Sequence, residues 1–229
     1  MRTVTKLMKN WQFTGPDGKT AAVELPHTWN HIDGQDGGND YKRGSCTYQT
    51  TFAKPAFDAN TQQVWLQFEG VNASAAVTLN GTEVIRHDGG YSTFRADITA
   101  LLAEQNTLTV IADNSKNDRV YPQKADFTFY GGIYRDVSLL VVSKNHIALN
   151  YLGSCGVRIT PTVKGSSADI RVQTRVEGEG EVEITVTDAA GSTVLTGTGT
   201  DTTLTMQHPH LWDGVRDPYL YSCTVRLVQ

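Results

Sequence analysis

The sequence predicts an all-β fold arranged in two consecutive domains. Short alternating or apolar segments recur along the chain, separated by turns rich in Gly, Asn and Asp, which is how β-strands and hairpins read in a sequence. Near Ser143 the composition changes, because aromatic residues become sparse and Thr and Val take over. We therefore expect one domain over residues 1–143 and a second over residues 144–229.

The first domain contains several strand patterns and one clear hairpin signal. The predicted strands lie at residues 64–68, 75–79, 83–86, 107–112 and 134–142. The pair Asn80-Gly81 stands between the second and third of them and supplies the two positive-φ residues of a type I′ turn, so these strands form a hairpin. Residues 134–142 are apolar for most of their length, which predicts a central strand. The only helix expected in this half is short, near residues 99–104, with Asp97 or Thr99 as its cap.

Two long stretches of the first domain carry no strand pattern. They span residues 26–43 and 113–125, and unstructured runs of this length in a compact domain are usually functional or disordered. For His27 and His31, both in the first stretch, a structural hydrogen bond is the expected role and a ligand site in the loop is the alternative. Asp113-Asn114-Ser115 opens the second stretch, and we expect it to orient that loop through bonds from an Asx side chain to the backbone.

The second domain reads as a small β-sandwich. Its predicted strands lie at residues 147–151, 157–163, 170–176, 182–186, 192–196, 203–206 and 219–227. About seven short strands with closely spaced turns are typical of an immunoglobulin-like sandwich. The disulfide of true immunoglobulin domains is not expected, because the chain has three scattered cysteines, Cys46, Cys155 and Cys223. We expect all three thiols to be reduced, as in a cytoplasmic protein.

The composition argues against several classes of partner. The chain has 229 residues, of which 39% are hydrophobic and 19% charged, an ordinary globular balance. Its net charge is −4 and it has no basic cluster, so nucleic acid is not an expected partner. No apolar run is long enough to span a membrane, and residues 1–6 lack the apolar core of a signal peptide. We expect a cytoplasmic location and no membrane partner.

No metal site or cofactor is expected in this chain. The histidines of His208-Pro209-His210 have no third ligand nearby in the sequence, and such a pair more often forms a turn at the end of a strand. Nucleophile motifs, phosphate-binding loops and zinc-protease motifs do not occur.

The most informative segment spans residues 126–137, with the sequence DFTFYGGIYRDV. Asp126 and three aromatic residues lead into Gly131-Gly132 and a strand. A carboxylate accepts hydrogen bonds from sugar hydroxyls, and aromatic rings cover the apolar face of a pyranose, so this chemistry is typical of sugar recognition. The alternative is that the glycines only make a tight turn and the aromatic rings belong to the core.

Three further segments accompany this one, at residues 25–30, 41–52 and 208–221. In this order, and spread over nearly the whole chain, the four segments resemble the N-terminal region of glycoside hydrolase family 2, the family of the β-galactosidases and β-glucuronidases. The resemblance implies a jelly-roll sugar-binding domain followed by an immunoglobulin-like β-sandwich domain. It also implies hydrolysis of O-glycosidic bonds by the full enzyme.

The resemblance implies that this chain carries no catalytic residue. A retaining glycosidase uses two carboxyl groups on opposite sides of the scissile bond, and in this family both are glutamates on a (β/α)₈ barrel, a domain of about 250 residues. The sequence shows no run of alternating strands and helices. The chain is therefore expected to be the non-catalytic N-terminal part of a β-galactosidase-like enzyme, inactive alone, which shapes the pocket of its barrel partner.

Two positions match sugar-binding residues of the family. Asp126 precedes Arg135 at the spacing of the aspartate that β-galactosidases lend to the galactose subsite. Asn39 is the chemical match for a second contact, an amide, although its spacing from Gly44 departs from the family pattern and weakens the match. Arg135 and Asp136 are expected to pair with each other and fix the turn.

Two other functions fit the same sequence. One is a free-standing carbohydrate-binding module, whose site would be complete within this chain. The other is a scaffold or oligomerisation module, which leaves a homo-oligomer open as a partner state. If the reading frame continues into a barrel with two suitably placed glutamates, the chain is part of an enzyme and neither of these two modules.

Overall fold

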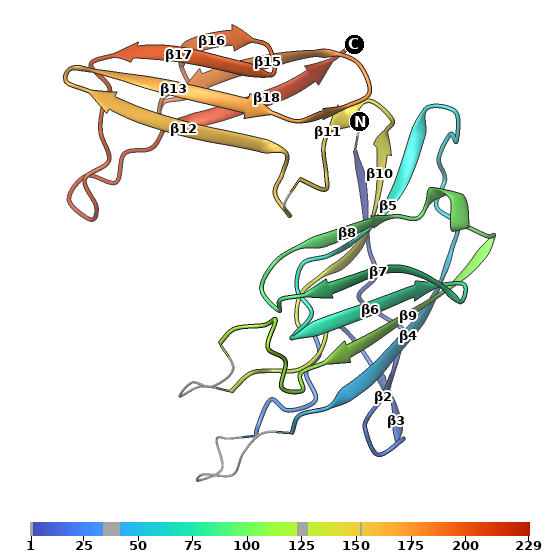
Figure 1. Cartoon of the computed structure of the whole chain (residues 1–229). Coiled ribbons are helices and arrows are strands. Elements are labelled where there is room, and N and C mark those ends of the chain that lie inside the picture. The colour runs from blue at the N-terminus through green and yellow to red at the C-terminus, as the bar shows by residue number, and fades with distance from the viewer. Residues whose placement is uncertain (1, 34–41, 123–127, 152) are drawn as a thin grey trace. The chain divides into compact units, whose positions relative to one another are not determined.

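The structure is a computed structural model that describes residues 2–33, 42–122, 128–151 and 153–229 (Figure 1). The chain divides into two compact units, Met1–Ser143 and Lys144–Gln229. The described residues form β-strands and one short 3₁₀ helix, so the prediction of an all-β chain is confirmed. No helix among them is long and apolar enough to cross a membrane.

The first unit is a sandwich of two antiparallel sheets. The six-stranded sheet runs in the order β3 (Thr20–Val23), β2 (Trp11–Thr14), β4 (Ser45–Ala53), β9 (Gln105–Asp113), β6 (Ser74–Leu79) and β7 (Thr82–Asp88). The four-stranded sheet runs in the order β1 (Thr3–Lys6), β10 (Val137–Ser143), β5 (Gln62–Phe68) and β8 (Phe94–Asp97). Every pairing is antiparallel, which suits a domain built from hairpins and Greek-key connections.

The core of this unit lies between the two sheets. Tyr48, Leu108 and Val110 on one sheet and Leu66 and Leu139 on the other belong to a single buried apolar cluster. Strands β4 and β9 alternate buried and more exposed residues, as strands with one face on the core do. Strand β10 is buried at six consecutive positions and pairs with both β1 and β5, so the central strand predicted from residues 134–142 is confirmed.

Local turn chemistry sets the hairpin between β6 and β7. Asn80 and Gly81 have φ values of 52° and 83°, the positive values that a type I′ turn requires. The Asn80 side chain also donates to the carbonyl of Leu101 at 2.9 Å. The helix predicted near residues 99–104 is shorter than expected, a single 3₁₀ turn over Thr99–Leu101, and the backbone N–H of Thr99 donates to Asp97 Oδ1 at 2.9 Å.

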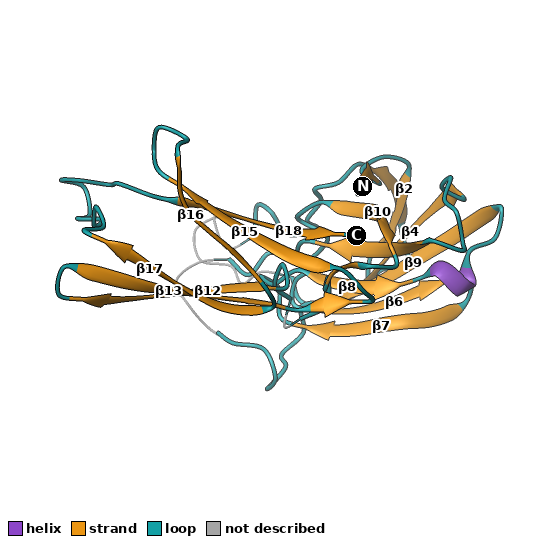
Figure 2. Cartoon of the chain, turned by 90° about the horizontal axis from the view of Figure 1, so that it is seen from above, coloured by secondary structure: helices purple, strands orange, loops and turns teal. Residues whose placement is uncertain are grey.

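The second unit consists of two three-stranded sheets and a short ladder. One sheet runs in the order β12 (Val157–Lys164), β13 (Ser167–Thr174) and β17 (Asp201–Gln207), and the other in the order β16 (Thr193–Thr198), β15 (Glu181–Thr187) and β18 (Ser222–Val228). The short ladder joins β11 (His146–Ile147) to β14 (Val176–Glu177). Figure 2 shows the two larger sheets as separate layers, and Val172, Val182 and Ile184 are buried in the cluster between them. Each of the seven predicted strands has a counterpart, although the first is reduced to two residues.

Candidate functional site

Both residues that the family resemblance assigns to sugar binding fall outside the described residues. Asn39 belongs to the segment 34–41 and Asp126 to the segment 123–127. The structure does describe the residues that flank these two segments, and they define the frame of the candidate site.

The flanking residues are bonded directly to one another. The backbone N–H of Lys42 donates to Asp33 Oδ2 at 2.8 Å, which closes the segment 34–41 at its base. The hydroxyl of Thr128, which follows the segment 123–127, donates to the carbonyl of Asp33 at 2.9 Å. Asp33 is therefore the point at which the ends of both segments meet.

The side chain of a buried asparagine, Asn30, also links residues that follow the two segments. Its side chain is fully buried, and its Nδ2 donates to the carbonyl of Phe129 at 3.2 Å and, at 3.5 Å, to that of Lys42. Its Oδ1 accepts a hydrogen bond from the backbone N–H of Gly131 at 2.8 Å. The amide thus satisfies backbone groups of Phe129 and Gly131, which lie about a hundred positions from Asn30 in the sequence.

A second buried asparagine, Asn114, donates to the same two backbone carbonyls. Its Oδ1 accepts from the backbone N–H of Gly44 at 2.8 Å, and its Nδ2 donates to the carbonyls of Lys42 at 3.2 Å and Phe129 at 3.4 Å. Buried polar groups must find partners inside the protein. We call Asn30 and Asn114, with the carbonyls of Lys42 and Phe129 that they share, the asparagine clamp.

The glycine pair of the 126–137 segment is required by close approach to the first long loop. A Cβ atom on Gly131 would lie 2.1 Å from Cζ2 of Trp29, and one on Gly132 would lie 2.5 Å from the carbonyl oxygen of His27 and 2.6 Å from the hydroxyl of Tyr48. Gly132 also has a φ of 131°, where L side chains are strained. Close packing therefore requires both glycines, and Gly132 forms an isolated β-bridge with Asn72.

Next to Gly132, the buried Tyr48 pairs with the partly buried His27. His27 Nδ1 lies 2.8 Å from the hydroxyl of Tyr48, and both rings pack against Phe13. Burial, and to a lesser extent the charge of His31, lowers the pKa of His27. Burial likewise raises the pKa of Tyr48 far above its ordinary value. The 2.8 Å contact with Tyr48 confirms the expected structural hydrogen bond of His27.

The aromatic residues of the 126–137 segment divide between core and surface. Phe129 is buried, whereas Tyr130 is 38% exposed. The Tyr134 hydroxyl donates to the carbonyl of Gly90. The core interpretation is therefore confirmed for Phe129, and a sugar contact by Tyr130 stays a prediction.

Arg135 and Asp136 are structural residues, but the prediction that they pair with each other is wrong. Arg135 Nη1 donates to the carbonyls of Glu69 at 3.4 Å and Tyr91 at 3.2 Å, while Asp136 forms an ion pair with Lys6 at 2.6 Å. Adjacent residues of an extended segment point in opposite directions, so each finds partners on its own side.

The loop that follows β9 is held by a carboxylate at the end of β7. The expected Asx-type bond is present, since the backbone N–H of Ser115 donates to Asp113 Oδ1 at 2.7 Å. Asp88 accepts hydrogen bonds from Arg119 Nε and Ser74 Oγ, both at 2.7 Å. The hydrogen bond from Arg119, followed by that from Ser74, lowers the pKa of Asp88 to about 2.

The histidine segment of the second unit forms a turn, as predicted. His208 follows β17 with a φ of 49°, and the ring of His210 stacks on Tyr219 with 3.9 Å between ring centroids. His210 Nε2 lies 2.6 Å from Asp217 Oδ2. No group of three His, Cys, Asp or Glu residues that could hold a metal ion occurs among the described residues.

This turn carries an exposed apolar surface, which we call the apolar loop. Its members, with their exposed fractions, are Leu211 (50%), Trp212 (64%), Val215 (99%) and Leu220 (69%). Contiguous exposed apolar patches are uncommon on monomeric proteins and usually mark contact surfaces.

Family models match both parts of the chain. The model described as the glycosyl hydrolase 2 galactose-binding domain-like family matches residues 36–148, and the model described as glycosyl hydrolases family 2 matches residues 150–229.

Among curated proteins, a β-glucuronidase of Bacteroides fragilis is 34% identical, and the match covers 96% of this chain and 35% of the relative. A β-galactosidase of Thermoanaerobacterium thermosulfurigenes is 32% identical over 61% of this chain and 21% of the relative. This chain spans about a third or less of the length of these curated relatives.

The solved structures give the same picture. An FMN-binding β-glucuronidase from Facaelibacterium prausnitzii L2-6 has a TM-score of 0.91 and 34% identity, and the match covers 99% of this chain and 37% of that one. A β-glucuronidase of Bacteroides uniformis has a TM-score of 0.80 and 28% identity, with 99% and 30% covered. The jelly-roll and immunoglobulin-like architecture expected from the sequence is therefore confirmed.

Proposed function

Because this chain belongs to glycoside hydrolase family 2, we propose that it provides the sugar-binding and immunoglobulin-like domains of a β-glycosidase that hydrolyses O-glycosidic bonds. In this proposal the first domain lends sugar contacts to the pocket of a catalytic barrel in the same polypeptide. The asparagine clamp is the observation that carries it. The clamp joins the bases of the two segments in which the family's sugar-binding positions fall.

The chemical step belongs to the barrel. Retention requires an acid and a nucleophile about 5–5.5 Å apart, and the family holds both on (β/α)₈ strands. The described part of this chain consists of β-sandwich strands and a single 3₁₀ turn. We therefore propose that the chain alone is inactive and that the apolar loop of the second unit, with Trp212 at 64% exposure, packs on the catalytic domain.

Asp126 is the residue we assign to substrate binding, with Asn39 as a weaker candidate. A carboxylate is an acceptor of hydrogen bonds, so it suits the hydroxyls of a neutral sugar such as galactose. Asp33 and the asparagine clamp, which hold the bases of both segments, reduce the ordering cost of binding in the way that preorganised sites do. A β-galactoside is the substrate that follows from these residues.

A β-glucuronide is the second candidate, and the names of the relatives favour it. The relative matched over 96% of this chain is a β-glucuronidase. A glucuronide carries its own carboxylate, which a nearby aspartate repels, so its pocket needs a cation to compensate. The two substrates therefore make opposite demands on the charge near residue 126.

The test is to express the complete reading frame that contains this segment and assay it with p-nitrophenyl β-galactoside and p-nitrophenyl β-glucuronide. The 229-residue chain, purified in the same way, is the matched control. We expect the long polypeptide to hydrolyse the galactoside and the chain alone to hydrolyse neither. Selective turnover of the glucuronide by the long polypeptide would establish the second candidate, and turnover by the chain alone would refute the division of labour.

A further inference from the structure

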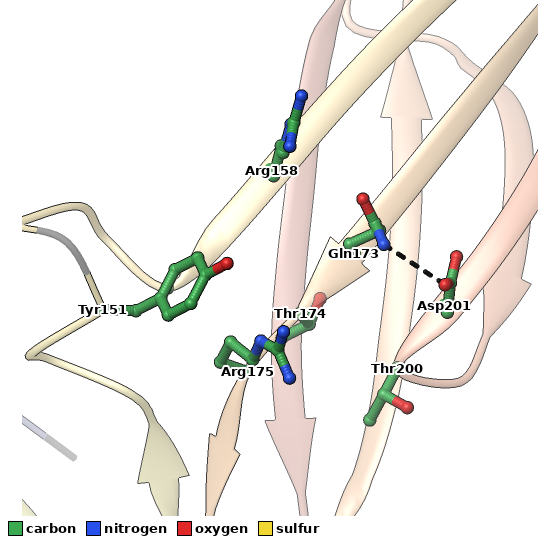
Figure 3. Close-up of a pocket in the computed structure, with 8 residues that line it drawn as sticks. Tyr151, Arg158, Gln173, Thr174, Arg175, Thr200 and Asp201 are labelled. Carbon is green, nitrogen blue, oxygen red and sulfur yellow. Dashed lines mark hydrogen bonds between the residues drawn. The ribbon is translucent and has the colours of Figure 1, made fainter.

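The second unit has a pocket that the proposed function does not use. It has a volume of about 400 Å³, within the range of about 300–1,000 Å³ that small-molecule sites occupy. It lies on the sheet β12-β13-β17 and the loops at its end (Figure 3). The lining residues are Tyr151, Gly156, Arg158, Gln173, Thr174, Arg175, Thr200 and Asp201.

Strand register places three of these side chains in one row. Arg158 on β12 is opposite Gln173 on β13, and Gln173 is opposite Asp201 on β17. Residues directly opposite in an antiparallel pair project from the same face of the sheet. This face is the outer one, because the intervening residue Val172 is buried in the core.

The charges of the pocket lining do not cancel, because it has two arginines and one aspartate. Asp201 accepts from both Nε and Nη2 of Arg171, at 2.8 and 2.6 Å, and from Gln173 Nε2 at 3.2 Å. Its charge is therefore balanced by an arginine outside the lining. Among the described residues, no carboxylate forms an ion pair with Arg158 or Arg175. The lining carries excess positive charge, although the whole chain has a net charge of −4.

One of the two arginines is held in place by an aromatic ring. The Arg175 guanidinium carbon lies 5.0 Å from the ring centroid of Tyr151, within the distance of a cation–π contact. Stacking engages the flat face of a guanidinium and leaves its N–H groups available in the plane. Those N–H groups match the geometry of a carboxylate or a phosphate.

We propose that this pocket binds a small oxyanion-bearing molecule of about monosaccharide size, through Arg158 and Arg175 with Gln173 as a neutral donor. The ligand group is a carboxylate or a phosphate, since both accept two parallel hydrogen bonds from a guanidinium. The site lies within the immunoglobulin-like domain and involves neither Asp126 nor Asn39.

Calorimetric titration of the 229-residue chain tests this assignment. The probes are glucuronate and glucose 6-phosphate, which separate the two oxyanions, and glucose, which lacks either. We expect saturable binding of at least one anion with a dissociation constant of about 1 mM or tighter, no binding of glucose, and weaker binding as salt rises.

Matched variants locate the site. Arg175→Gln and Arg158→Gln should each weaken anion binding at least tenfold. Arg226→Gln removes the same charge from β18 in the other sheet and should leave binding unchanged. All three arginines are exposed, so the fold is expected to survive each change. Absence of saturable binding by both anions, equal binding of glucose, or an equal loss in Arg226→Gln would overturn the proposal.

Discussion

At the scale of single residues, the candidate site depends on amides that contact no ligand. Asn30 and Asn114 are 0% and 2% exposed, and each bonds backbone groups from segments distant in the sequence. Sequence reasoning assigned Asn114 only a local turn role and gave Asn30 none, because an asparagine in a loop looks like a turn residue. The burial of both depends on long-range partners that no local pattern reveals.

Replacing a clamp residue should lower stability. Asn30→Ala leaves the backbone N–H of Gly131 and the carbonyl of Phe129 without this partner in a buried site, and an unsatisfied buried group costs about 1–3 kcal/mol. We expect the free energy of unfolding, measured by urea denaturation, to fall by that amount. Asn60→Ala, at an exposed position in the same unit, is the control and should change it little. Equal stabilities of the two variants would contradict the clamp.

Asp126 is tested by separating kinetics from stability in the complete enzyme. A hydrogen bond to a charged group inside a closed pocket is worth about 1.5–3 kcal/mol. We therefore expect Asp126→Asn, which keeps the shape and removes the charge, to lower kcat/KM for a β-galactoside by about one to two orders of magnitude. The melting temperature should stay the same. Lost stability with unchanged kinetics per folded molecule would mean that Asp126 only caps its loop.

At the scale of elements, strands with a strong local signal were predictable, whereas β1, β2, β3 and β8 of the first unit were not among the predicted strands. The β6–β7 hairpin followed from Asn80-Gly81 and the central β10 from its apolar run, since both signals are local. The 3₁₀ turn at Thr99–Leu101 is shorter than expected, because the backbone is already extended at Leu102, with φ −70° and ψ 123°. The separate partners of Arg135 and Asp136 lie on segments distant in the sequence, which only the fold brings near.

The contact between β7 and the loop after β9 should depend on pH. Asp88 has its pKa lowered to about 2 in the fold, below the ordinary value of about 3.9 expected in the unfolded chain. Its contribution is therefore complete above about pH 4 and is lost as the pH falls toward 2. Its side chain is 37% exposed and that of Arg119 is 71% exposed, so we expect no more than about 1 kcal/mol.

Urea unfolding of the wild type and Asp88→Asn at pH 7, 5 and 3 measures this contribution. The difference in free energy should be similar at pH 7 and 5 and smaller at pH 3. The variant Asp97→Asn, which alters another carboxylate of the same unit, serves as the comparison. A difference that grows as the pH falls would contradict the assignment.

At the scale of the whole molecule, the chain is two separately cored sandwiches that account for about a third of the relatives' length. The fold and the family were accessible from the sequence, because four motifs occurred in the family order. The substrate was not, because relatives named for two different sugars share this region. The pocket beside Arg175 was also missed, since its residues lie on separate strands and in loops, with no motif.

The isolated chain should self-associate through its apolar loop. Trp212 is 64% exposed and Val215 is 99% exposed, and exposed apolar patches promote association. Sedimentation velocity should show the average mass rising with concentration, and Trp212→Ser should reduce the rise. Tyr121→Ser, which removes an exposed aromatic residue from the first unit (74% exposed), is the control. A strictly monomeric profile at high concentration would count against this prediction.

In the asparagine clamp, the side-chain Nδ2 groups donate to backbone carbonyls, those of Lys42 and Phe129. A carbonyl is present whatever the side chain, so the identities of residues 42 and 129 are not constrained by these bonds. The sequences of segments 34–41 and 123–127 are then free to diverge, or to be exchanged by a protein engineer, while the residues that flank them stay in place. Loop grafting between relatives that act on different sugars is the practical use of such a frame, with Asn30, Asn114 and Asp33 as the residues to leave untouched.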